Sequence, residues 1–121
     1  MDAIADVTCC AMLMEEINPD KVVVSPINTG FGKVKCAHGI LPVPAPATAN
    51  LLEGMVCYSG NIEGELCTPT GAAILKYYVN EFGNMPAMIM EKQGYGMGNK
   101  DFPVANCIRA CLLYTSDAAD D

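Results

Sequence analysis

The chain has 121 residues, a formal net charge of −7 and 51% hydrophobic residues. This length allows one domain with a modest core, and the hydrophobic content excludes a chain that is disordered by composition. The acidic balance gives no support to nucleic-acid binding, which needs a basic face. Since no apolar run approaches the ~18 residues of a membrane span, a membrane is not an expected partner either.

The first predicted element is a helix over residues 3–17. Apolar residues recur there at spacings of three and four, which places them on one stripe of a helix. The stripe consists of Ile4, Val7, Ala11, Met14 and Ile17. Pro19 ends the helix, because proline disfavours helical geometry in the residue before it.

Two strands are predicted next, separated by a turn-rich connection over residues 26–32. The β-branched run 21–25 predicts a buried strand. Residues 33–38 alternate enough for a second strand, with Cys36 and His38 on one face. His38, the only histidine, then lies at a strand end, where function often gathers in α/β sheets.

A proline-rich segment leads into a short helix and a third strand. Pro46 suits the first turn of a helix that runs through Glu53, and Gly54 suits its left-handed end. Residues 55–58 predict the strand.

The clearest helix signal begins at Thr68. Thr68 suits the N-cap, Pro69 the first turn and Gly83 the residue after the C-terminus. The predicted buried stripe of this helix consists of Leu75, Tyr78, Val79 and Phe82.

The last part of the chain predicts two strands, 87–91 and 106–110, around a glycine-rich turn at 94–101. Strands interleaved with helices indicate an α/β (α+β) fold, in which a mixed β-sheet is covered by about three helices.

The start of the Thr68 helix is a candidate anion site. The first backbone N–H groups of a helix have no internal partner, and the helix dipole favours negative charge there. Thr70 and Gly71 therefore offer donors that could hold a phosphate. Simple capping by Thr68 is the alternative interpretation of the same residues.

His38 is the natural metal contact, because imidazole binds borderline divalent metals and its neutral form is available near pH 7. Cys36 has the same strand parity and could approach the same metal. Asp2 and Asp6 lie one helical turn apart, so their carboxylates can converge. The alternatives are a structural histidine and an Asp2 charge that only stabilises the helix dipole.

The cysteines are scattered, without C-x-x-C pairs or zinc-finger spacing. Disulfides of a secreted protein are one interpretation of seven cysteines. Reduced thiols that act as small apolar residues in a cytoplasmic protein are the favoured one.

Three strings resemble the LarC family of nickel insertion proteins. They are Val-Lys-Cys-Ala-His-Gly at 34–39 with its proline-rich continuation at 41–48, Gly-Glu-Leu-Cys-Thr-Pro-Thr-Gly-Ala-Ala at 64–73, and Gly-Tyr-Gly-Met-Gly-Asn-Lys-Asp at 94–101. The resemblance implies a nickel chelatase of the lyase class, which inserts Ni²⁺ into the pyridinium-3,5-bisthiocarboxylic acid mononucleotide and so makes the nickel-pincer cofactor of lactate racemase. It also implies CTP as a co-substrate with a divalent metal, Mg or Mn, in the full-length protein.

Within this resemblance, His38 is the expected catalytic residue and nickel ligand, with Cys36, Asp2 and Asp6 as further ligands. Thr68, Thr70 and Gly71 are expected to hold the substrate phosphate. The imidazole and the helix start should then face one cleft. The resemblance leaves room for a homo-oligomer in the full-length protein.

The chain is expected to be an internal fragment, since the family's His-x-His-Glu string is missing before Asp2. Residues 1–110 would form a single α/β domain, and residues 111–121 resemble a translated sequencing adapter, a non-native tail. We expect the isolated fragment to be inactive. Two other functions stay open: a non-catalytic nickel-delivery or scaffold module, and a thiol enzyme that uses Cys36 with His38.

Overall fold

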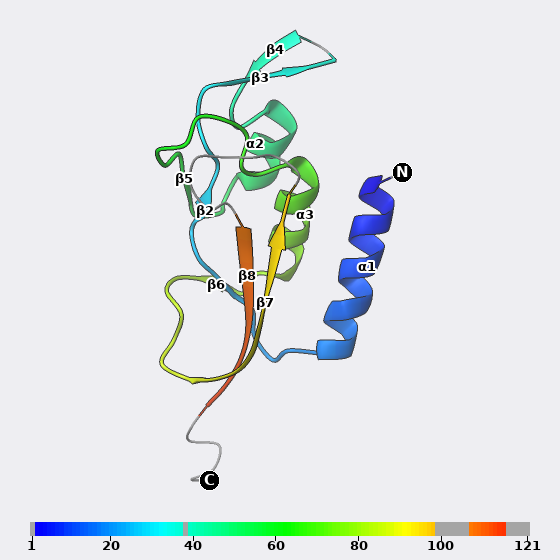
Figure 1. Ribbon diagram of the computed structural model, residues 1–121, viewed down its shortest axis with the longest axis vertical. Coiled ribbons are helices and arrows are strands. Elements are labelled where there is room, and N and C mark those ends of the chain that lie inside the picture. Colours follow the sequence, from blue (N-terminus) through cyan, green and yellow to red (C-terminus); the bar gives the residue numbers. More distant parts are fainter. Residues whose placement is uncertain (1, 38, 99–106, 116–121) are drawn as a thin grey trace. The chain divides into compact units, whose positions relative to one another are not determined.

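The computed structural model describes residues 2–37, 39–98 and 107–115. The chain divides into two compact units, Met1–Asn84 and Met85–Asp121. In the described residues, the three helices all belong to the first unit, and the second unit is built around one antiparallel pair of strands (Figure 1).

Helix α1 (Asp2–Ile17) confirms the first prediction almost residue for residue. The N–H of Asn18, which has φ 47, donates to the carbonyl of Met14 at 2.8 Å and closes the last turn before Pro19. The predicted apolar stripe is mostly uncovered, however: Ile4 is 69% and Ile17 45% exposed. Helix α1 contacts α3 (Pro69–Tyr78) through a narrow part of its surface.

Two short parallel pairs connect distant parts of the first unit. Strand β1 (Val23–Val24) pairs with β6 (Glu81–Phe82), and β2 (Ile27–Asn28) pairs with β5 (Cys57–Tyr58). Strands β1 and β5 confirm the strands predicted at 21–25 and 55–58, in shorter form, but β1 is half-buried where a buried strand was predicted. Strand β2 lies inside the predicted connection, since its pairing partner is far away in the sequence.

Strand β3 (Lys33–Cys36) forms a hairpin with β4 (Gly39–Pro42), in which Cys36 is opposite Gly39. The strand predicted over 33–38 is confirmed from Lys33 to Cys36, and His38 lies outside the described residues. The sequence interpretation missed β4, because the prolines from Pro42 onward argue against a strand.

Helix α2 (Pro46–Leu52) begins at the expected proline, and Gly54 after it has φ 85, as predicted. Helix α3 also begins as predicted, with Thr68 at the N-cap and Pro69 in the first turn. Its predicted end at Gly83 was wrong. The helix ends at Tyr78, because residues 81–82 are extended and pair with β1.

The core lies between α2, α3 and the parallel pairs. Its buried members are Ile27, Leu52, Cys67 and Ala72. The partly buried side chains packed against them are Val24, Leu51, Met55, Leu75 and Phe82. Burying one large aliphatic side chain contributes about 1.5 to 3 kcal/mol, so this small cluster is the main attachment of α2 and α3 to the strands.

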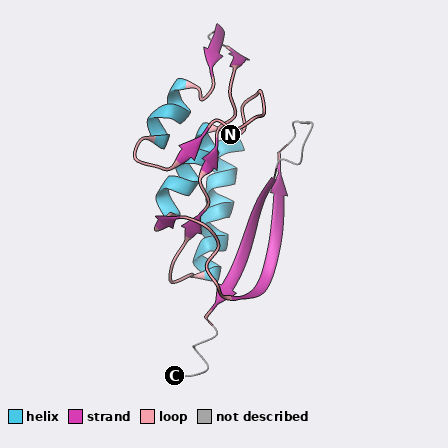
Figure 2. Ribbon diagram, turned by 90° about the vertical axis from the view of Figure 1, so that its left-hand side faces the viewer, coloured by secondary structure: helices cyan, strands magenta, loops and turns pink. Residues whose placement is uncertain are grey.

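The second unit contains a long hairpin of β7 (Ile89–Met97) and β8 (Cys107–Tyr114), which Figure 2 shows as a long, curved pair. The turn predicted at 94–101 was wrong for its first four residues, since Gly94 pairs with Ala110 inside the ladder. Strand β8 continues past Ala110 to Tyr114. The predicted boundary between residues 110 and 111 stays a prediction.

The α/β class with three helices is confirmed for the described residues. Their strands form four two-stranded pairs, two parallel and two antiparallel, in place of one larger sheet. No helix in the described part of the chain has the length and apolar character needed to cross a bilayer.

Candidate functional site

Two loops follow the parallel strands β2 and β5 and bond to one another. The N–H of Phe31 donates to the carbonyl of Ile62 at 3.2 Å, and the N–H of Gly64 donates to the carbonyl of Phe31 at 2.9 Å. The N–H of Leu66 donates to the carbonyl of Thr29 at 3.1 Å. These bonds fix the segment that leads into α3 at the carboxyl ends of the strands, where α/β proteins place ligands.

Gly30 makes the closest approach between the two loops. It has φ 78, and a Cβ atom added there would lie 2.0 Å from the carbonyl oxygen of Gly64. The side chain of Asn28 accepts from the Gly30 N–H at 3.1 Å, and the buried Thr29 hydroxyl donates to the Gly30 carbonyl at 2.8 Å. Only glycine fits this contact, so Gly30 sets the distance between the loops.

The start of α3 is capped by its own sequence. The Thr68 Oγ1 accepts from the N–H of Gly71 at 3.2 Å, and the Thr68 carbonyl accepts from the N–H of Ala72 at 2.9 Å. Pro69 has no N–H to offer. A phosphate at Gly71 would therefore have to displace the Thr68 hydroxyl. The hydrogen bond that capping by Thr68 requires is therefore present, while the phosphate assignment of Thr68, Thr70 and Gly71 stays a prediction.

Cys67, immediately before this cap, is a core residue with 8% exposure. Burial raises the pKa of its thiol above the ordinary value of 9.0, and electrostatic interactions with Glu65 and Cys57 raise the pKa further. A buried thiol with a raised pKa is a poor nucleophile and a poor metal ligand. Cys67 therefore behaves as the small apolar residue that the sequence interpretation expected.

The described residues do not test the predicted metal site. His38 lies outside them, and of Asp2 and Cys36 only the backbone is described, in α1 and β3. Asp6 is exposed on α1. No group of three or more His, Cys, Asp and Glu residues in the described ranges could hold a metal ion. The ligand set stays a prediction.

A cleft of about 520 Å³ lies where α1 and α3 end. Its lining comprises Ala11, Met14, Glu15, Asn18, Pro19, Asp20, Val22, Tyr77, Tyr78 and Asn80. None of the predicted site residues is in this lining. Sequence reasoning missed the cleft, although the adjacent tyrosines were visible near the end of the predicted helix.

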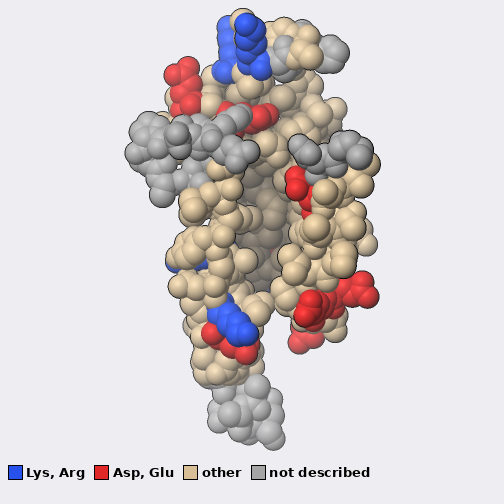
Figure 3. Space-filling model, turned by 45° about the vertical axis from the view of Figure 1, so that its right-hand side comes forward, with Lys and Arg blue, Asp and Glu red and all other residues tan. Residues whose placement is uncertain are grey.

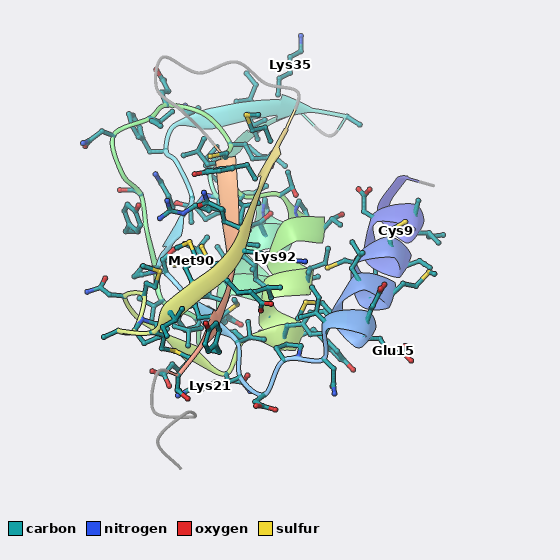
Figure 4. All side chains as sticks on the ribbon, turned by 60° about the horizontal axis from the view of Figure 1, so that its bottom comes forward. Cys9, Glu15, Lys21, Lys35, Met90 and Lys92 are labelled. Atoms are coloured by element: carbon teal, nitrogen blue, oxygen red, sulfur yellow. The ribbon has the colours of Figure 1, made fainter. Side chains whose placement is uncertain are left out.

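Charged side chains are scattered over the face shown in Figure 3, without a continuous basic patch among the described residues visible there. Lys33 and Lys35 on β3 are exposed, whereas Val34 between them is half-buried. Lys35 points away from its hairpin (Figure 4).

The chain was compared with known proteins. The sequence profile of the family described as "Nickel insertion protein" matches residues 1–121. Because the match spans the whole sequence, the chain belongs to the nickel insertion protein family. No solved structure matches the chain.

Similar curated proteins have names that state a substrate. The chain is 46% identical over 121 residues to the "Pyridinium-3,5-bisthiocarboxylic acid mononucleotide nickel insertion protein" of Desulfitobacterium hafniense (strain DSM 10664 / DCB-2), covering 100% of this chain and 29% of that protein. Proteins of the same name from Staphylococcus saprophyticus and Geobacillus kaustophilus are both 43% identical, over 116 and 103 residues. These two alignments cover 96% and 85% of this chain, and 29% and 25% of the relatives. The chain thus spans less than a third of their length.

Proposed function

We propose that this chain acts, as part of a longer protein, in the insertion of nickel into pyridinium-3,5-bisthiocarboxylic acid mononucleotide. The observation that carries the proposal is the family match over residues 1–121. The name of the Desulfitobacterium relative, at 46% identity, supports the same substrate.

Nickel and the mononucleotide are both substrates of this reaction. The proposed steps are binding of the sulfur-rich mononucleotide, loss of a proton from a pyridinium carbon, and formation of nickel–carbon and nickel–sulfur bonds. The product would be the nickel-pincer cofactor of lactate racemase. CTP and its Mg or Mn ion would act elsewhere in the full-length protein, which we expect to be cytoplasmic.

His38 is the proposed nickel ligand and proton acceptor. In the sequence it comes between β3 and β4, and its own placement lies outside the described residues. Cys36, Asp2 and Asp6 are the proposed companions, because soft and hard donors together suit a borderline metal.

The nickel role is tested with His38→Ala in a full-length protein that contains this sequence. Formation of the nickel chromophore from the mononucleotide, Ni²⁺ and CTP is followed by absorbance. We expect His38→Ala to abolish it and Lys35→Ala, an exposed change on the same hairpin, to leave it unchanged. Chromophore formation at the normal rate in His38→Ala would remove the assignment.

The phosphate role needs a binding measurement. Thr70→Val and Gly71→Val are expected to weaken binding of the mononucleotide to the full-length protein, while the folded state is verified by circular dichroism. Unchanged affinity in both variants would leave Thr68 as a helix cap only.

The isolated chain is expected to form no chromophore, because it spans only 29% of the relatives' length. CTP-dependent insertion by these 121 residues alone would contradict this expectation. A protein that only carries nickel would lower the free Ni²⁺ concentration without producing the chromophore, so the same assay separates delivery from insertion.

A further inference from the structure

The cleft where α1 and α3 end has two walls that are held together. One wall is the last turn of α1 with the residues after it, and the other is the last turn of α3 with Asn80. The Val22 N–H donates to the Asn80 Oδ1 at 2.6 Å, and the Asn80 N–H donates to the Val22 carbonyl at 2.9 Å. These reciprocal bonds fix one side of the opening. The depression, about 520 Å³, is open to solvent.

The charges in the cleft have one sign. Glu15, in the last turn of α1 (Figure 4), and Asp20 contribute carboxylates, and none of the lining residues is basic. Lys21, next in the sequence, forms an ion pair with Glu81. Burial raises the pKa of Tyr78, and its neighbours Cys10, Tyr77 and Glu15 raise the pKa further, as expected beside negative charge.

Two tyrosine rings give the cleft an aromatic wall. The Tyr77 and Tyr78 rings are in edge-to-face contact, with centroids 4.9 Å apart and an interplanar angle of 84°. Tyr77 is 81% exposed, so its ring is open to a ligand. Ring faces attract cations, most strongly planar and weakly hydrated ones.

We propose that this cleft binds a guanidinium group. A guanidinium can donate two parallel N–H···O bonds to a carboxylate and stack on an aromatic ring at the same time. Glu15 supplies the carboxylate, and Tyr77 supplies the ring. This site is separate from the residues proposed for nickel insertion and does not depend on that function.

The test titrates the 121-residue chain with N-acetyl-arginine methylamide and follows the tyrosine ring signals by NMR. The matched neutral ligand is N-acetyl-citrulline methylamide, which keeps the shape and loses the charge. We expect saturable shifts of the Tyr77 and Tyr78 signals with the arginine compound and none with the citrulline compound. Equal binding of the two compounds, or no saturable binding of the arginine compound, would overturn the proposal.

Glu15→Gln and Glu16→Gln form a matched pair of variants. Both residues are exposed on α1, but only Glu15 lines the cleft. We expect Glu15→Gln to weaken binding about fivefold, as for an exposed charge pair, and Glu16→Gln to leave it unchanged. Equal affinities of the two variants would refute the site, and Tyr77→Leu gives a second, uncharged check with the same expected loss.

The source of the guanidinium is distinguished with two further probes. Methylguanidine that binds as tightly as the arginine compound supports a site for a small free ligand. Tighter binding of the tripeptide Gly-Arg-Gly supports an arginine side chain presented by a polypeptide.

Discussion

Single glycines decide how closely the loops after β2 and β5 approach. Gly30 and Gly54 both have positive φ, 78 and 85, but their surroundings differ. A Cβ at Gly30 would meet the Gly64 carbonyl oxygen at 2.0 Å, whereas a Cβ at Gly54 would meet nothing within 4 Å. An added side chain at Gly54 would therefore cause backbone strain alone, whereas one at Gly30 would cause backbone strain and a steric clash.

Gly30→Ala is expected to lower the free energy of unfolding by about 3 kcal/mol or more, because strain and clash act together. Gly54→Ala should cost about 1 to 2 kcal/mol, the strain of a left-handed residue alone. Urea denaturation monitored by circular dichroism measures both. Equal losses in the two variants would show that the loops separate without cost.

The thiol of Cys67 links stability to pH. Since its pKa in the folded chain is raised above 9.0, the unfolded state releases this proton first as the pH rises. The contribution of the Cys67 thiol to the free energy of unfolding is complete below the pKa of this thiol in the unfolded chain. It is lost as the pH rises from there through the pKa of the thiol in the folded chain. The free-energy advantage of the parent chain over Cys67→Ala should therefore shrink as the pH rises above 9.0.

Cys67→Val is the matched control for this experiment, because it fills the core better than alanine and also lacks a titrating group. Both variants should show the same pH dependence relative to the parent and differ only by a constant packing free energy. Curves for the parent and both variants that stay parallel over this pH range would contradict the linkage.

At the scale of elements, the N-terminus of α3 depends on one hydroxyl. Thr68→Ala removes the acceptor of the Gly71 N–H and should lower the free energy of unfolding by about 1 kcal/mol. Thr68→Ser keeps the hydroxyl and should keep most of this stability. The midpoints of urea denaturation measure the stability of both variants. If the serine variant is as unstable as the alanine variant, the loss of stability comes from the threonine methyl group and not from the hydroxyl.

Helix starts were predictable from the sequence because their signals are local. Pro46, Thr68 and Pro69 act within one turn, and both helices begin where these residues predict. The end of α3 was not predictable, because the pairing of β6 with β1 spans more than fifty residues and overrides the helical pattern. The cleft was missed for the same reason, since its walls come from the ends of α1 and α3.

The fold bears on the predicted phosphate site at the start of α3 more directly than on the predicted nickel ligands. The sequence identified a helix start suited to anions, and the structure adds that its Gly71 N–H already has a partner. The proposed nickel ligands come from α1 and from the β3–β4 hairpin, so their convergence depends on tertiary contacts that spacing alone does not encode. Periodicity could place Asp2 and Asp6 on one helix face, but not beside Cys36 or His38.

For the whole molecule, the buried core found among the described residues lies in the first unit. All four of its buried members lie between residues 27 and 72, and the partly buried side chains around them end at Phe82. The unit boundary falls after Asn84. A chain of residues 1–84 should therefore fold cooperatively, with Cys67 still protected from alkylation.

A second truncation, residues 1–79, tests where this unit must end. It removes Asn80, which bonds twice to Val22, and Phe82, which packs on the core. It also removes the N–H of Gly83, which donates to the Val24 carbonyl at 3.0 Å. At about 1 kcal/mol per hydrogen bond, plus the burial of one aromatic ring, the 1–79 chain should lose at least about 3 kcal/mol relative to 1–84. Urea denaturation and the alkylation rate of Cys67 compare the two chains, and an unfolded 1–84 chain would show that the first unit needs the β7–β8 hairpin to fold.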